Sequence, residues 1–193
     1  LATAVLRHKG IVLDSVIDDK KHRRMISEPL VTITEKKLGY IPRSLEIDEQ
    51  SVSHKLEQGH VLLEYIKYEQ FNLVGGKLEN IDRYGVVLIG KNDEKRKSKR
   101  NLPIWIPLNA ADLSNEKIES LGQSLTGAGS AQILRSLYDA IIAPVIPHLP
   151  LETKSLLISP DSELNFLSFP SLLDPQGKFL CETYEVLHLS SGR

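Results

Sequence analysis

Apolar residues in the first 26 positions recur at helical intervals. They lie one, three, seven or eight positions apart, and the charged residues fall mostly off the stripe that they form. The stripe consists of Val5, Leu6, Leu13, Val16 and Ile17. A basic run at 20–24 follows, where cations complement the carboxyl end of a helix. We therefore expect a helix over residues 1–26, and Ser44 is a candidate N-cap for a polar helix running towards Lys55.

From Gly59 onward the pattern becomes that of β-strands. Residues 60–68, 84–90 and 104–108 are rich in strand formers and are predicted to be three strands. Between the last two lies the segment 91–100, which carries six basic and two acidic residues. It has no aromatic residue on which a base could stack. We interpret it as a solvated hairpin tip rather than a nucleic-acid contact.

The second half alternates between helix and strand patterns. Helices are expected over 109–125 and 133–146. The second has a broad apolar face, and Ser130 is its candidate N-cap. Pro144 and Pro147 are expected to kink or end it near Ala143. The apolar run 155–159 is typical of a strand buried in a parallel sheet. We expect this strand to lie inside the sheet under the 133–146 helix, so that Leu157→Ala costs about 2–5 kcal/mol. A strand pair is expected within 179–189, which gives an α/β fold.

Composition narrows the class of protein. Lys and Arg together number 24 against 25 Asp and Glu, a formal net charge of −1, which removes a global electrostatic drive towards nucleic acid or anionic membranes. A single cysteine excludes an internal disulfide and suits a reducing cytoplasm, which is the expected location. The longest apolar stretch, 140–145, is too short to span a bilayer. Leu1 stands where an initiator Met would be, so we expect a fragment.

Candidate chemical groups are few. No two of the six histidines stand at the spacing that puts two metal ligands on one helix face. The six are His8, His22, His54, His60, His148 and His188. The segment 127–130 resembles a phosphate loop only superficially, because it follows a helix and lacks a lysine. Cys181 could act as a nucleophile only with a base beside it, and in a single strand 181–189 its nearest histidine, His188, would face the other way. We interpret Cys181 as a small buried hydrophobe. No catalytic, cofactor-binding or metal-binding residue is assigned.

Several segments resemble one family. Residues 137–144 read LYDAIIAP and residues 156–170 read LLISPDSELNFLSFP, with Ser162 where the family usually has glycine. Residues 172–175 and 184–193 continue the similarity, and 5–14, 61–65 and 105–108 fit its earlier part. In order and content these segments resemble CHAT domains, the caspase-like domains found with tetratricopeptide repeats.

The resemblance implies a partial caspase-like domain with a mostly parallel sheet flanked by helices. A small β-rich subdomain and an N-terminal helix would precede it, with residues 1–58 as a helical lead-in after a repeat region and 59–193 as the front of the CHAT domain. CHAT domains resemble caspases and separase, cysteine peptidases that use a His–Cys dyad. The sequence reaches Arg193 before either catalytic residue, so nothing catalytic is carried over to Cys181.

Two functions follow from this resemblance. In the first, the chain is the front part of a cysteine endopeptidase and supports a dyad located beyond residue 193. In the second, it is an inactive caspase-like interaction or scaffold module. The expected partners are the remaining catalytic half of the domain, the repeat region, and a protein substrate or regulatory protein. We also expect strand 184–189 to leave an open sheet edge, and truncation to explain the end at Arg193 better than physiological cleavage.

Overall fold

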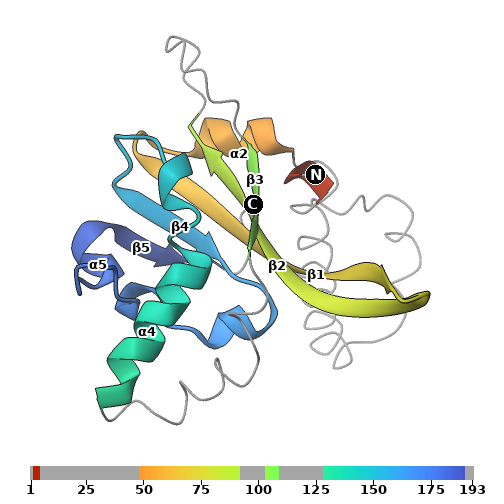
Figure 1. The fold of residues 1–193 in the computed structure, drawn as a ribbon. Helices are drawn as coiled ribbons and strands as arrows, with labels where there is room; N and C mark the ends of the chain where they lie inside the picture. Colours follow the sequence, from red (N-terminus) through yellow and green to blue (C-terminus); the bar gives the residue numbers. More distant parts are fainter. Residues whose placement is uncertain (1, 5–47, 92–102, 109–127, 190–193) are drawn as a thin grey trace, which may run out of the picture.

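The computed structural model describes residues 2–4, 48–91, 103–108 and 128–189 (Figure 1). In these ranges a central sheet is flanked by helices. Its helices and strands are α2 (Glu49–Lys55), β1 (His60–Val74), β2 (Lys77–Gly90), β3 (Ile104–Leu108), α4 (Ala128–Ile141), β4 (Ser155–Ser159), α5 (Leu180–Thr183) and β5 (Glu185–His188). Three short 3-10 helices cover Ile146–His148, Ser162–Phe166 and Phe169–Ser171. The expected α/β class is confirmed. No helix in the described ranges has the length and apolar content to cross a bilayer.

The five strands form one mixed sheet in the order β3-β2-β1-β4-β5. β1 pairs with β4 and β4 with β5 in parallel, whereas β2 is antiparallel to both of its neighbours. The expectation of a mostly parallel sheet preceded by a separate β-rich subdomain therefore needs correction. Because β1 pairs with β2 along one edge and with β4 along the other, the early strands and the later ones share a single sheet.

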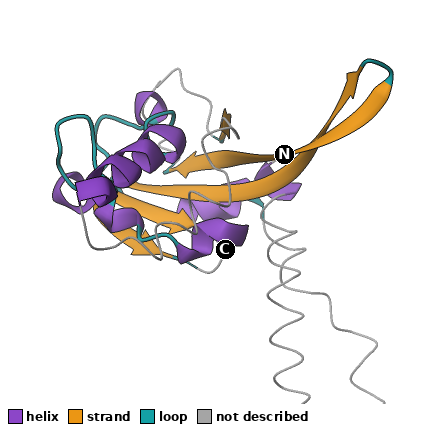
Figure 2. Cartoon of the chain, turned by 60° about the horizontal axis from the view of Figure 1, so that its bottom comes forward, coloured by secondary structure: helices purple, strands orange, loops and turns teal. Residues whose placement is uncertain are grey.

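The β1–β2 hairpin is much longer than the strand patterns indicate. Its strands continue to Val74 and resume at Lys77, joined by Gly75 and Gly76 with φ of 57° and 81°. Two successive positive φ values are typical of the two-residue turn that matches strand twist. β4 pairs only with residues 60–64 and β3 only with 84–88, so the rest of the hairpin projects from the sheet as a ribbon (Figure 2). The expected hairpin tip at 91–100 lies outside the described residues, apart from Lys91.

One face of the sheet is covered by α4, as expected. Leu156 and Ile158 of β4 are fully buried in the same cluster as Leu137 and Ile141 of the helix. The Tyr65 hydroxyl of β1 donates a hydrogen bond to the Ile141 carbonyl at 2.9 Å, which ties the sheet to the end of the helix. The prediction that β4 lies inside the sheet under this helix is confirmed.

The opposite face holds a second, smaller cluster. α2 places Val52 and Leu56 against the sheet, and Ala2 packs into the same cluster. Asp48 caps α2 by accepting a hydrogen bond from the Ser51 amide at 2.7 Å, and the Ser53 hydroxyl donates to the Gly90 carbonyl at 2.7 Å. Leu157 belongs to this face and is only half-buried. The expectation that Leu157→Ala costs about 2–5 kcal/mol therefore needs correction, because alternate residues of β4 point to opposite faces and Leu157 does not face α4.

Two local expectations need correction. Ser130 is not an N-cap, because α4 already begins at Ala128. The helix ends at Ile141, close to the expected end near Ala143. The expected strand pair within 179–189 is instead the short helix α5 followed by β5. The Glu182 carboxylate accepts a hydrogen bond from the Phe179 amide at 2.6 Å, which favours a helical turn over an extended strand. Ser44, residues 5–26 and the helix expected over 109–125 lie outside the described residues.

Candidate functional site

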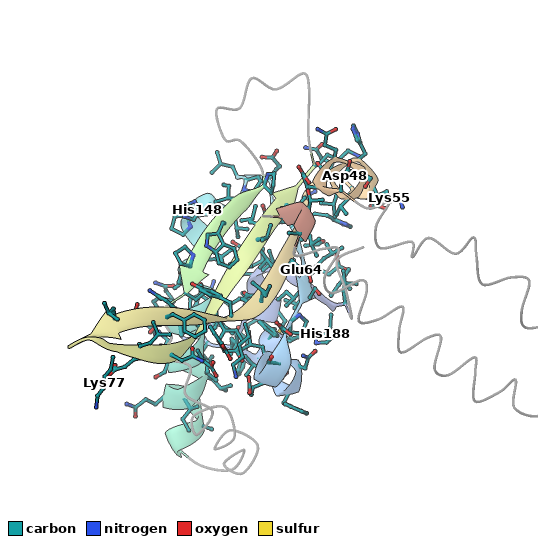
Figure 3. All side chains as sticks on the ribbon, turned by 90° about the vertical axis from the view of Figure 1, so that its right-hand side faces the viewer. Asp48, Lys55, Glu64, Lys77, His148 and His188 are labelled. Carbon is teal, nitrogen blue, oxygen red and sulfur yellow. The ribbon has the colours of Figure 1, made fainter. Side chains whose placement is uncertain are left out.

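Cys181 and His188 do not form a catalytic pair. Cys181 lies on α5 with its side chain exposed, because the short helix turns Leu180 inward and its neighbour outward. His188 is exposed at the carboxyl end of β5 (Figure 3). Neither side chain hydrogen-bonds to another group in the described part of the chain. The interpretation of Cys181 as a small buried hydrophobe was wrong, because the cysteine is exposed.

The carboxyl ends of parallel strands are where open α/β sheets usually bind ligands. At this position the Ser159 hydroxyl of β4 donates a hydrogen bond to Glu64 Oε1 of β1 at 2.8 Å. Both residues are fully buried, and they lie on the face opposite α4, because Leu62 and Leu157, two residues before each of them, belong to the α2 cluster. Sequence reasoning gave them no role. Glu64 was visible as the one charged residue in the run 61–66, and its partner could not be read from the strand pattern.

A second polar group lies where the hairpin leaves the sheet, and we name it the neck cluster: Lys67, Asp82, Tyr84 and Glu163. Lys67 Nζ lies 3.0 Å from Glu163 Oε1 and 3.1 Å from Asp82 Oδ2. The Tyr84 hydroxyl donates a hydrogen bond to Glu163. The segment after β4 is thus attached to the base of the ribbon by charged hydrogen bonds.

The turn that presents Glu163 has an unusual backbone. Asp161 Oδ2 accepts a hydrogen bond from the Lys67 amide at 2.8 Å, and Asp161 Oδ1 accepts one from the Ser162 amide at 2.9 Å. Ser162 has a φ of 48°, and among the described residues it is the one non-glycine with positive φ. Glycine adopts this conformation without strain. The geometry explains why a glycine suits this position in the motif that the sequence resembles.

The neck cluster shifts the pKa values of its members. The hydrogen bond from Tyr84 and those from Lys67 hold the pKa of Glu163 below its usual value, against the opposing effect of burial. Burial lowers the pKa of Lys67, but its bonds to Glu163 and Asp82 outweigh that effect and raise the pKa above its usual value. Burial, followed by the bond to Glu163, raises the pKa of Tyr84. All three groups therefore keep their normal charge at neutral pH, which suits a structural connection.

Glu163→Gln should lower the free energy of unfolding by about 1–2 kcal/mol at neutral pH, since it weakens two charge-assisted hydrogen bonds. The folded pKa of Glu163 lies below its ordinary value of 4.5, so its contribution is complete above that pH and is lost as pH falls through the folded pKa. Urea unfolding of both proteins at several pH values should therefore show a difference that shrinks in acid.

Glu79→Gln is the matched control for this experiment. Glu79 is exposed on the same hairpin, and its replacement should change the free energy of unfolding by less than about 0.5 kcal/mol. A loss from Glu163→Gln that persisted unchanged well below the ordinary carboxylate pKa would contradict a stabilising role for the ionised group.

The described residues enclose one small cavity that bears on ligand binding. A cavity of about 30 Å³ lies between the start of β1 and the loop before β4, lined by residues that include Gly59, His60, Pro150 and Glu152. Such a volume holds no more than a water molecule or two. In the described ranges no group of three side chains could hold a metal ion. Of the segment 127–130, which superficially resembles a phosphate loop, the structure describes residues 128–130, and these form the first turn of α4.

Comparison with known proteins adds one finding. A family model described as CHAT domain matches residues 131–193. No curated protein and no solved structure matches the chain. The matched segment holds most of α4 together with β4, α5 and β5, including the Asp161–Glu163 turn at the neck cluster. The family model thus matches the family that the sequence resembles, and residues 131–193 are similar to a CHAT domain.

Proposed function

We propose that this chain is the front part of a caspase-like CHAT cysteine endopeptidase and that it supports a His–Cys dyad located beyond residue 193. The observation that carries the proposal is the CHAT match over residues 131–193, which ties the chain to a caspase-like, peptidase-related function. In the described residues the one cysteine is exposed, and no hydrogen bond or ion pair joins it to a base. A supporting role therefore fits the chain better than a catalytic one.

The sheet is suited to support further strands. β5 is the last strand on its side of the described sheet, and it is parallel to β4. A following strand of the same domain would add in parallel beside β5 and bring its carboxyl end to the edge at which Ser159 and His188 end their strands. In this proposal residues 1–58 are a helical lead-in after a repeat region, residues 59–193 begin the CHAT domain, and the protein works in the cytoplasm on a protein partner.

An inactive scaffold is the second candidate, and the projecting ribbon favours it. Three apolar side chains on the ribbon, Phe71, Leu73 and Leu78, are well exposed. Exposed apolar groups that lie together mark interaction sites more often than catalytic ones. The two candidates differ in whether a catalytic pair follows Arg193 in the parent protein.

The polypeptide 1–193 alone should hydrolyse no peptide bond, because a thiol without an oriented base is weakly activated. The measurement is thiol-dependent cleavage of an unstructured protein substrate by the chain and by the complete parent protein. The parent protein should cleave, should lose activity when the His or Cys beyond residue 193 is replaced, and should keep it in Cys181→Ser.

Cleavage by the verified 1–193 chain that disappears in Cys181→Ser would overturn this assignment. A parent protein that has no His–Cys pair and no activity would leave the scaffold as the function.

A further inference from the structure

The far end of the β1–β2 ribbon carries apolar side chains that the fold does not cover. Phe71, Leu73 and Leu78 are 58%, 75% and 68% exposed. They lie far from the two core clusters, beyond the neck cluster, and Figure 3 labels Lys77 at this end of the ribbon. Large apolar groups exposed on an edge strand favour pairing with another chain.

The three side chains share one face of the ribbon. Leu73 stands opposite Leu78 in the register, and Phe71 stands opposite Asn80. Residues directly opposite each other in an antiparallel pair point to the same side, as do residues two apart in a strand. Phe71, Leu73 and Leu78 therefore form one small patch, which we name the tip patch.

Of the two ribbon edges, that of β1 is the better one for pairing. Along residues 68–74 it carries a single charged residue, Glu69, whereas residues 77–83 of β2 carry four: Lys77, Glu79, Asp82 and Arg83. Charged residues on an edge strand discourage pairing with another strand. In the described structure β4 leaves the β1 edge after residue 64, and no described strand pairs with it beyond that point. Among the described residues, the β1 edge is thus not paired with another strand beyond residue 64, and it carries fewer charges than the β2 edge.

The backbone of β1 determines which residues face this edge. The Lys67 amide donates outward to Asp161, and so odd-numbered residues direct their backbone groups away from β2. Glu69, Phe71 and Leu73 follow at intervals of two. A second antiparallel strand can therefore form hydrogen-bonded pairs at Phe71 and Leu73.

We propose that a second copy of this chain pairs with the first through these β1 edges, antiparallel, about a two-fold axis at Asn72. In this register Phe71 stands opposite Leu73 of the second copy, and the reverse contact follows by symmetry. The two tip patches then join on one face of a four-stranded ribbon. On the face of the tip patch the edge is self-complementary in this register, because Phe71 meets Leu73 and Glu69 meets Gly75 of the turn, whereas on the other face Val74 meets Gln70.

The size of the contact predicts a weak dimer. Three side chains of this exposure contribute a few hundred Å² of apolar surface from each copy, below the roughly 800 Å² per partner of a stable complex. Dimerisation should therefore depend on concentration. Sedimentation velocity of the 1–193 chain should show a monomer that converts to a dimer as concentration rises towards about 1 mM.

Leu73→Lys should weaken the dimer at least about tenfold, since it places like charges near the two-fold axis. The matched control is Phe166→Lys, which changes an apolar residue that is 88% exposed outside the ribbon and should leave association unchanged. A chain that stays monomeric throughout, or a dimer that Leu73→Lys leaves intact, would overturn the proposal and leave the tip patch to a different partner.

A crosslinking experiment tests the register. In a Cys181→Ser background, Asn72→Cys should give a disulfide-linked dimer, since residues at the two-fold axis form a non-hydrogen-bonded pair with Cα atoms about 4.5 Å apart. Gln70→Cys on the same face is the control, because its counterpart in the second copy lies four residues away, about 13 Å. Equal crosslinking of both variants would show random collision and overturn the register.

Discussion

Leu156→Ala should lower the free energy of unfolding by about 2–5 kcal/mol, the range for a buried leucine whose site cannot collapse. Leu156 is fully buried in β4, between β1 and β5 and beneath α4. The sheet on both sides and the helix above restrict relaxation around the cavity. Urea unfolding monitored by circular dichroism measures the loss, with an unchanged dependence on urea concentration as the sign that the folded and unfolded states stay comparable.

Leu157→Ala is the control for that experiment, because it removes the same atoms from the adjacent residue. Leu157 is half-buried on the α2 face, so its loss should be less than half as large. A cost below about 1 kcal/mol for Leu156→Ala would contradict the placement of β4 inside the sheet. Equal costs for the two variants would contradict the assignment of the two faces.

The elements that sequence patterns predicted well are those with long apolar signals. The run Ser155–Ser159 lacks alternation because both of its faces meet other residues, and α4 shows a broad apolar stripe because it covers the sheet. In both cases burial in the tertiary structure and the local pattern agree. Ile104–Leu108 was likewise found with the correct bounds.

The outer half of the β1–β2 hairpin was missed for a physical reason. Residues 69–83 pair only with each other, so no core selects apolar residues on alternate positions. Their strand structure depends on the cross-strand ladder and on Gly75 and Gly76, which the strand pattern does not contain. The expectation of a strand at α5 was wrong for a local reason. Its four residues have strand-like neighbours, but the hydrogen bond from the Phe179 amide to the Glu182 carboxylate favours a helical turn.

The neck cluster could not have been predicted from one sequence. Lys67 and Glu163 are 96 residues apart, and each is an ordinary charged residue in its own segment. Only the parallel pairing of β1 with β4 brings the turn after Ser159 beside the base of the ribbon. The motif around Asp161 resembles the CHAT family, and the family model matches the segment that contains this motif. The role of the motif in holding the hairpin, however, depends on the long-range contact between Asp161 and Lys67.

Gly85→Ala should lower the free energy of unfolding by about 1–3 kcal/mol, the usual cost of forcing an extra group into a packed site. Gly85 lies in β2 between Ile66 of β1 and Pro107 of β3. A Cβ atom there would stand 2.1 Å from the ring of Trp105, which also packs against Tyr68 with ring centroids 5.7 Å apart. The ring must move before alanine fits, and that movement removes its contacts on the sheet.

Trp105→Ala provides the second arm of a double-mutant cycle. Without the indole ring, Gly85→Ala should cost nothing or become stabilising, because alanine restricts the unfolded chain more than glycine does. The chain has one tryptophan, so its fluorescence reports on this ring alone. Gly85→Ala should shift the emission of the folded protein towards that of an exposed indole. If stability and emission both stayed at wild-type values, the close approach of Trp105 to Gly85 would be refuted.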